Sequence, residues 1–263
     1  MFETRLLSSL SKVFADEELQ DAAVKTGSCL RGEVYSFQVA YRSQELVKGI
    51  EVEVASSLAR HIEVRTVGLV PAEFLGARFD DDVLRTTPGL YPDPLYGLHA
   101  GVDAPPGQWR ALWVQVRVPK RSVQGRHEIA LRLGHGGRLL GSERFVLEVV
   151  PVVLPAQRLI HTSWFHADCI AAHYGDTTWS RGHWRRLEQF VHSAVDHGVN
   201  LLLTPLFTPP LDTQVGGERP TVQLVQVKKD GDRYAFDFSR LDRWVKMADR
   251  CGVRYFEMAH LFT

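Results

Sequence analysis

The sequence predicts a multi-domain β plus α/β chain. An antiparallel β-sandwich over residues 1–155 is followed by the first three strands of an incomplete (β/α)8 barrel of the TIM type over 156–263. Three observations lead to this fold class. Apolar and polar residues alternate with period two in the first half. The Pro-bounded stretch PVVLPAQRL, 151–159, marks a change of rhythm. Beyond it, short apolar runs alternate with segments of helical periodicity, which is typical of parallel strands joined by crossover helices.

The first half contains several segments with alternating side chains: EVYSFQVAYRS, IEVEV, RALWVQVRVP, HEIALRL and RFVLEV. In the first of these, Tyr35, Phe37 and Val39 share one face. Glycine and proline residues separate the segments, as expected of half-buried antiparallel strands. Many such strands without a long helix predict a sandwich. Residues 79–107 are rich in Pro, Gly and Asp and are expected to form an irregular excursion.

The second half has the order strand, helix, strand, helix, strand. The segments are LIHTSWFHAD, SRGHWRRLEQFVHSAVDHGVN, NLLLTPLF, SRLDRWVKMADRCGV and RYFEMAHLF. Trp184 and Trp244 fall on the inner stripes of the two helices and are expected in the core. A hairpin-like insert, TVQLVQVKKDGDRYAFDF, precedes the second helix. A complete barrel needs about 250 residues, so residues 158–263 are expected to hold fewer than half of its strands.

Composition disfavours several classes of function. The chain has 31 basic and 31 acidic residues, so no basic field attracts nucleic acid or a membrane surface. No apolar run approaches a membrane span, and no secretory signal is recognised. Three widely spaced cysteines are typical of reduced, buried thiols, which together with the missing signal favours a cytoplasmic protein. The sequence does not indicate an oligomeric state.

Two stretches carry a family resemblance: LFTPPLDTQVGGERPTVQLVQV and YAFDFSRLDRWVKMADRCGVRYFEMAHLFT. They resemble bacterial proteins with the domain of unknown function DUF4091, which are related to glycoside hydrolase family 123. The sandwich stretches GEVYSFQVAY, YPDPL and WRALWVQVRVPKRSVQGRHEIAL are similar to that family's N-terminal domain. The resemblance implies the N-terminal portion of a retaining β-N-acetylgalactosaminidase with substrate-assisted catalysis. In such enzymes the acetamido oxygen of the substrate attacks the anomeric carbon, an Asp orients the acetamide, and the adjacent Glu is the general acid/base.

The resemblance assigns no catalytic residue to this chain. In the family, the Asp-Glu pair follows the fourth barrel strand, in a stretch resembling SDEP. The only Asp directly followed by Glu here is Asp16-Glu17, in an N-terminal segment outside the expected barrel. The pair is therefore expected beyond Thr263, and residues 1–263 are expected to be inactive.

Polar and aromatic residues at the ends of the expected strands are candidates for substrate binding, because barrel enzymes hold their chemistry at the carboxyl ends of the strands. Trp164, His166 and Asp168 are expected on one face of the first strand. They either stack on and hydrogen-bond a sugar or pack in the barrel interior. A metal site is disfavoured because His-x-Asp lacks the spacing of HExxH, and we expect no metal and no cofactor.

Four further candidates follow the second strand or lie on the third. Asp212 and Arg219 either bind sugar hydroxyls or form an ion pair within their loop. Glu257 and His260 either orient the substrate or form a buried pair. The partner implied by the resemblance is an amino-sugar glycoside.

Two other functions stay open. The chain could be a non-catalytic carbohydrate-binding or scaffolding protein with a degenerate barrel. It could also belong to a branch of the broader family with another glycoside specificity.

Overall fold

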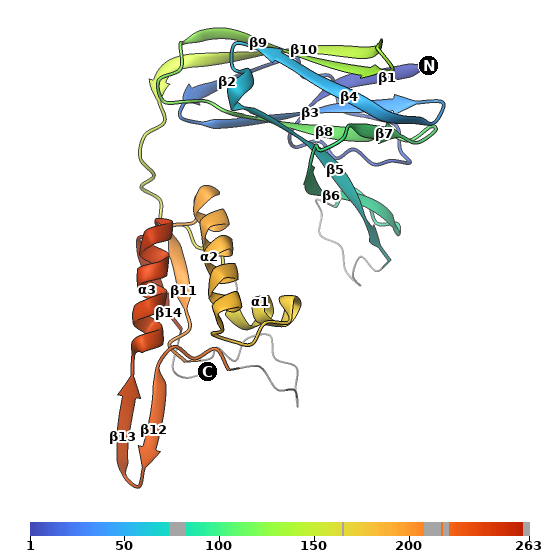
Figure 1. Cartoon of the computed structure of the whole chain (residues 1–263). Coiled ribbons are helices and arrows are strands. Elements are labelled where there is room, and N and C mark those ends of the chain that lie inside the picture. Colours follow the sequence, from blue (N-terminus) through green and yellow to red (C-terminus); the bar gives the residue numbers. More distant parts are fainter. Residues whose placement is uncertain (74–82, 165, 208–216, 218–220, 260–263) are drawn as a thin grey trace. The chain divides into compact units, whose positions relative to one another are not determined.

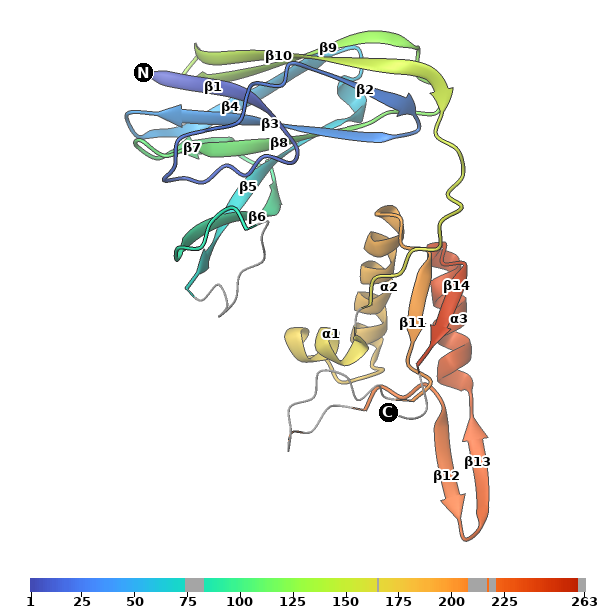
Figure 2. The same ribbon diagram turned by 180° about the vertical axis from the view of Figure 1, so that it is seen from behind.

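The computed structural model describes residues 1–73, 83–164, 166–207, 217 and 221–259. The chain divides into two compact units, Met1–Pro155 and Ala156–Thr263. Figure 1 labels the elements of both units, and Figure 2 shows them from behind. None of the helices within the described ranges is long and apolar enough to cross a membrane.

The first unit contains two five-stranded sheets. One sheet has the order β1 (Phe2–Ser8), β3 (Val34–Ser43), β8 (Arg110–Arg117), β5 (Ile62–Ala72) and β6 (Gly89–Gly97). The other has the order β2 (Thr26–Arg31), β10 (Arg138–Val153), β9 (Gly125–His135), β4 (Val47–Ser56) and β7 (Val102–Ala104). A short 3-10 helix spans Ala59–His61.

The strands of this unit depart from the sequence prediction in two places. β2 pairs with β10 in parallel, whereas the prediction had antiparallel strands throughout. The segment expected to be an irregular excursion contains β6 and β7, which pair with β5 and β4. Pro92 and Pro94 argue against a strand at β6 in the sequence. However, β6 is an edge strand, where a residue without a backbone N–H is tolerated.

An apolar core joins the two sheets. Phe37 of β3 stacks on Phe145 of β10 with ring centroids 4.1 Å apart. Both rings are almost completely buried, and residues from both sheets surround them. In β9, Leu131 and Leu133 are buried on either side of the exposed Arg132. The period-two pattern therefore places one face of each sheet in this core.

The second unit has two layers around a small core. Helices α1 (Ala167–Tyr174), α2 (Arg181–Asp196) and α3 (Ser239–Cys251) accompany the strands β11 (Leu201–Thr204) and β14 (Tyr255–Met258). β11 and β14 pair in parallel. β12 (Gln226–Asp230) and β13 (Arg233–Asp237) form a separate antiparallel hairpin. Trp184 and Trp244 are buried, which confirms their predicted place in the core.

Local signals explain the ends of these helices. Ser180 accepts a hydrogen bond from the backbone N–H of His183 at the start of α2. Gly252 has a φ of 98° and ends α3 in the left-handed region. The sequence suggests a capping box of Ser239 and Asp242, but Asp237 instead accepts the backbone N–H of Ser239. The same hydrogen bond lowers the pKa of Asp237.

The predicted incomplete (β/α)8 barrel is wrong. The chain is 47% strand and 17% helix, and no barrel of this type is present in the described part of it. Within the described residues of the segment predicted as the first barrel strand, Thr162 forms a parallel bridge with Leu201, and α1 begins at Ala167. Leu159 and Ile160, at the start of the predicted strand, are 75% and 52% exposed. Ala167 and Asp168, predicted as the end of this strand, instead begin α1, because the stretch that they open has the composition and the glycine stop of a helix.

The Phe37–Phe145 contact gives a test of the first unit's core. We expect Phe145→Ala to destabilise this unit by about 3–5 kcal/mol, because it removes a buried ring and leaves a cavity. Hydrogen exchange of the amides in β3 and β10, measured by mass spectrometry, would show this as faster exchange. The control is Val123→Ala in an exposed turn. Equal exchange in the two variants would contradict the proposed role of the ring stack.

Candidate functional site

The parallel pairing of β11 with β14 creates one edge where both strands end, here called the carboxyl edge. In its register, Leu203 lies opposite Glu257 and Thr204 opposite Met258. The bridge from Thr162 to Leu201 brings a third segment, ending in Trp164, alongside β11. Ligand sites of open α/β sheets lie at such edges, so this edge is the candidate site.

Trp164 and Glu257 meet at the carboxyl edge. The indole Nε1–H of Trp164 donates to Oε2 of Glu257 at 2.8 Å, across 93 residues of sequence. The Trp164 side chain is 49% exposed, and Glu257 is half-buried. The hydrogen bond fixes the plane of an indole ring that still presents apolar surface to solvent. Two of the residues predicted to bind substrate are thus in contact.

His166 and Asp168 lie in a different setting from the predicted strand. His166 is the N-cap residue of α1, and Asp168 is in the first turn of that helix. They therefore do not share a strand face with Trp164. Asp168 is 4% exposed, and its charge is favourably placed at the positive end of the helix dipole.

Sequence reasoning missed His183, which is completely buried. Its Nδ1 accepts the backbone N–H of Trp179 at 2.9 Å. Because Nδ1 is an acceptor, the ring proton is on Nε2, which donates to the carbonyl oxygen of Ala167 at 2.8 Å. His183 therefore ties α2 to the first residue of α1, next to His166 and Asp168. A signal was present, because His183 continues the inner stripe of Leu187 and Val191 by one helical turn.

An aromatic cluster supports the carboxyl edge from inside. Trp179 lies 4.9 Å from Trp184 and 6.3 Å from Trp244, measured between ring centroids. The indole N–H of Trp244 donates to Oγ1 of Thr204 at 3.3 Å. Trp179 holds a φ of 63°, which costs energy for a residue with a side chain. Packing against two other indoles offsets that cost and locks the loop before α2.

Three other candidates, Asp212, Arg219 and His260, lie outside the described residues. Within the described ranges, no three His, Cys, Asp or Glu side chains are grouped so that they could hold a metal ion.

The comparison with family models gives the decisive observation. Residues 164–263 match the model of the glycoside hydrolase 123 catalytic domain. The resemblance to glycoside hydrolase family 123 is confirmed. The matched range begins at Trp164 and includes Glu257, so the contact at the carboxyl edge lies inside the range that the family model matches. No curated protein is detectably similar in sequence.

Solved structures agree at the level of the fold. The chain is similar to a family 123 glycoside hydrolase from Clostridium perfringens, whose study concerned glycolipid glycan hydrolysis. The TM-score is 0.74 at 13% identity, over 96% of this chain and 46% of that one. At this identity the likeness shows the fold alone. The chain spans a little under half of the length of that enzyme.

Two further structures were matched at lower similarity. The macrocyclisation enzyme AvmM has a TM-score of 0.32 at 9% identity, over 60% of this chain and 92% of its own. The N-terminal domain of PorA has a TM-score of 0.27 at 8% identity, over 57% of this chain and 99% of its own. Scores this low carry no argument about this protein.

Thiol chemistry is suppressed at two of the three cysteines. Burial, followed by the charge of Glu33, raises the pKa of Cys29 to about 11. Burial also raises the pKa of Cys251, and the charge of Glu188 adds to the effect. Cys169, on α1 of the family 123 region, is exposed, in contrast to the expectation of three buried thiols.

The thiols give a direct test of accessibility. We expect a maleimide at neutral pH to label Cys169 rapidly and Cys29 and Cys251 slowly, because the thiolate is the reactive form and a raised pKa keeps it scarce. Labelling of Cys29 should accelerate as the pH rises toward its pKa. Peptide mass spectrometry over time measures this. Rapid labelling of Cys29 in the folded protein would contradict its burial.

A second test concerns His183. We expect His183→Leu to destabilise the second unit by about 1–3 kcal/mol, because Trp179 N–H and the Ala167 carbonyl lose their buried partner. Faster amide exchange in α1 and the start of α2 would report it. His192→Leu, an exposed position on the same helix, is the matched control. If both variants exchange alike, His183 does not join the two helices.

Proposed function

We propose that this chain is part of a glycoside hydrolase that cleaves terminal β-linked amino sugars with retention of configuration. The family 123 match over residues 164–263 carries the proposal. The Trp164–Glu257 contact supports it, because it sets an exposed indole and a carboxylate at a sheet edge suited to ligands. An indole face packs against the apolar face of a sugar ring, and a carboxylate accepts hydrogen bonds from sugar hydroxyls.

The proposed reaction follows the substrate-assisted scheme that the family resemblance implies. The acetamido oxygen of the substrate attacks the anomeric carbon while the glycosidic C–O bond breaks. A general acid donates its proton to the departing oxygen. Water then opens the resulting oxazolinium ring with the same residue acting as base, which restores the β configuration. This differs from retaining glycosidases that use a carboxylate nucleophile.

In this scheme the residues of the second unit recognise the sugar. Trp164 stacks on the sugar ring, and Glu257 accepts a hydrogen bond from a sugar hydroxyl. His166 and Asp168, at the start of α1, are proposed to contact the substrate from the neighbouring segment. Asp212, Arg219 and His260 are proposed to complete the binding site.

We further propose that residues 1–263 bind the amino sugar without hydrolysing it. In residues 156–263 no Asp is directly followed by Glu, so the pair expected to orient the acetamide and supply the proton is not found there. A protein that binds carbohydrate as its whole function is the second candidate. A longer protein containing this chain separates the two, because hydrolysis by it would exclude pure binding.

The proposal is tested with purified 1–263 and two epimeric sugars, N-acetylgalactosamine and N-acetylglucosamine. We expect saturable binding of at least one of them, detected by saturation-transfer NMR. Nitrophenyl β-glycosides of both should release no nitrophenol. Turnover that disappears on substitution of a residue within this chain would show that the chain holds its own catalytic acid.

Graded variants test the carboxyl edge. Trp164→Ala should weaken binding by about tenfold, the equivalent of losing one ring stack. Trp164→Phe keeps an aromatic face but loses the N–H, so it should weaken binding less. Glu257→Gln keeps an oxygen acceptor but loses the charge, so its affinity measures how much the carboxylate charge contributes to binding. Glu148→Gln, an exposed position in the first unit, is the control. Unchanged affinity in Trp164→Ala would remove Trp164 from the site.

A further inference from the structure

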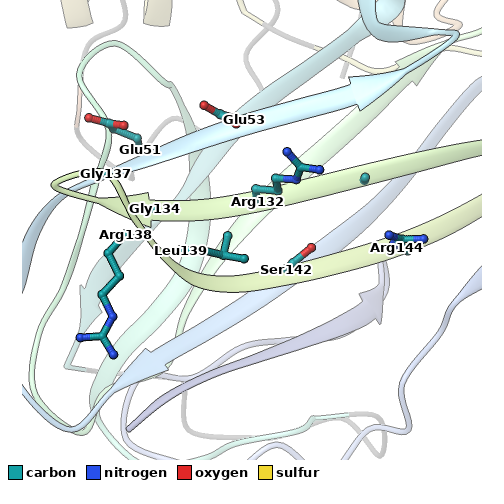
Figure 3. A pocket seen from close by; sticks show the side chains of 10 residues that line it. Glu51, Glu53, Arg132, Gly134, Gly137, Arg138, Leu139, Ser142 and Arg144 are labelled. Atoms are coloured by element: carbon teal, nitrogen blue, oxygen red, sulfur yellow. The ribbon is translucent and has the colours of Figure 1, made fainter.

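The first unit has a hollow on the outer face of the sheet that contains β2, β10, β9, β4 and β7. The hollow extends across β4, β9 and β10 (Figure 3). Its volume is about 430 Å³. Small residues leave this space: Ala130 and Gly134 on β9 are two residues to either side of Arg132. Arg132 lies opposite Glu53 of β4 and opposite Ser142 of β10. The hollow therefore has a shallow floor with a guanidinium group near its middle.

Charged groups dominate the lining. Arg132, Arg138 and Arg144 contribute three guanidinium groups, against the two carboxylates of Glu51 and Glu53. In Figure 3, Arg132 lies across from Ser142 on the neighbouring strand, Arg144 lies farther along the strand of Ser142, and the side chain of Arg138 points away from all three. The ten residues that line the hollow include no aromatic ring, so a neutral sugar would find no stacking surface.

The guanidinium groups are available to a ligand. Within the described part of the chain, Arg132 and Arg138 make no ion pair or side-chain hydrogen bond, although Glu53 is directly opposite Arg132. Arg144 lies 3.6 Å from Glu128, and both side chains are more than half exposed. An exposed pair of this kind stabilises little and is readily exchanged for another anion. Guanidinium groups bind planar carboxylates and sulfates through two parallel hydrogen bonds.

We propose that this hollow binds a glycan that carries sulfate or carboxylate groups. Arg132 and Arg144 bind the anionic group above Ser142, and Glu53 accepts hydrogen bonds from neighbouring sugar hydroxyls. The two glutamates repel a densely charged polyanion, so the lining favours a ligand whose anionic groups are separated by hydroxyls. This site is independent of the amino-sugar chemistry proposed for the second unit.

The test uses probes without amino sugars, so that the carboxyl edge does not respond. Calorimetry with 1–263 would compare a carrageenan oligosaccharide, which carries sulfate, with trigalacturonate, which carries carboxylates, and with neutral maltohexaose. We expect saturable binding of at least one acidic probe, weakening as salt rises, and none of maltohexaose. Preference between the acidic probes identifies sulfate or carboxylate as the anion. No saturable binding of either, or equal binding of maltohexaose, would overturn the proposal.

Variants locate the binding. Arg132→Ala and Arg144→Ala should each weaken binding by about tenfold, since each removes a charge-assisted contact. Glu53→Gln keeps an oxygen that accepts hydrogen bonds from sugar hydroxyls but removes a negative charge that repels the anion, so it should strengthen binding, which a merely structural role would not produce. Arg60→Ala, which removes an exposed arginine outside the hollow, and Trp164→Ala should leave it unchanged. Circular dichroism would verify the fold of each variant. An equal loss in Arg60→Ala, or no loss in Arg132→Ala and Arg144→Ala, would place the ligand elsewhere.

Discussion

The parallel pairing of β11 with β14 is the constraint on which the candidate site depends. Its register sets Leu203 beside Glu257 and ends both strands at one edge. The buried hydrogen bond from Trp244 to Thr204 fixes the end of β11 against α3. Because a buried polar group without a partner is costly, this bond and the strand pairing stabilise the same arrangement. Only then do Trp164 and Glu257 come within hydrogen-bond distance.

Hydrophobic periodicity predicts the buried side chains correctly where burial depends on a residue's position within one helix or strand. Trp184 is buried on the inner stripe of α2, as predicted, and Leu187 and Val191 continue that stripe at helical spacing. Leu131 and Leu133 alternate with exposed residues on β9, also as predicted. In these elements the sequence pattern alone shows which side chains face the core, because the position of a residue along one helix or strand determines the direction of its side chain.

Hydrophobic periodicity does not predict the structure of segments whose conformation depends on pairing with distant strands. Residues 159–168 have the pattern of a strand, but a strand needs partners along its length, and among the described residues of this range the isolated bridge is that of Thr162 with Leu201. The helix that follows was readable from Gly175, whose φ of 64° ends α1. The sequence indicates Trp164 and Glu257 as candidates for substrate binding because each lies near the end of an apolar segment. Their hydrogen bond was not predictable, since it depends on a strand register that no local pattern contains.

The geometry of the carboxyl edge separates recognition from bond cleavage. A general acid must present a proton to the departing oxygen, and in the substrate-assisted scheme it stands beside a second carboxylate that holds the acetamide. Glu257 is an acceptor toward the indole N–H of Trp164, and among the residues that the structure describes its side chain pairs with that ring rather than with another acid. A carboxylate held in this way orients an aromatic surface and accepts hydrogen bonds from sugar hydroxyls. Its place in the reaction we propose is therefore to position the sugar, while proton transfer requires a different pair of acids.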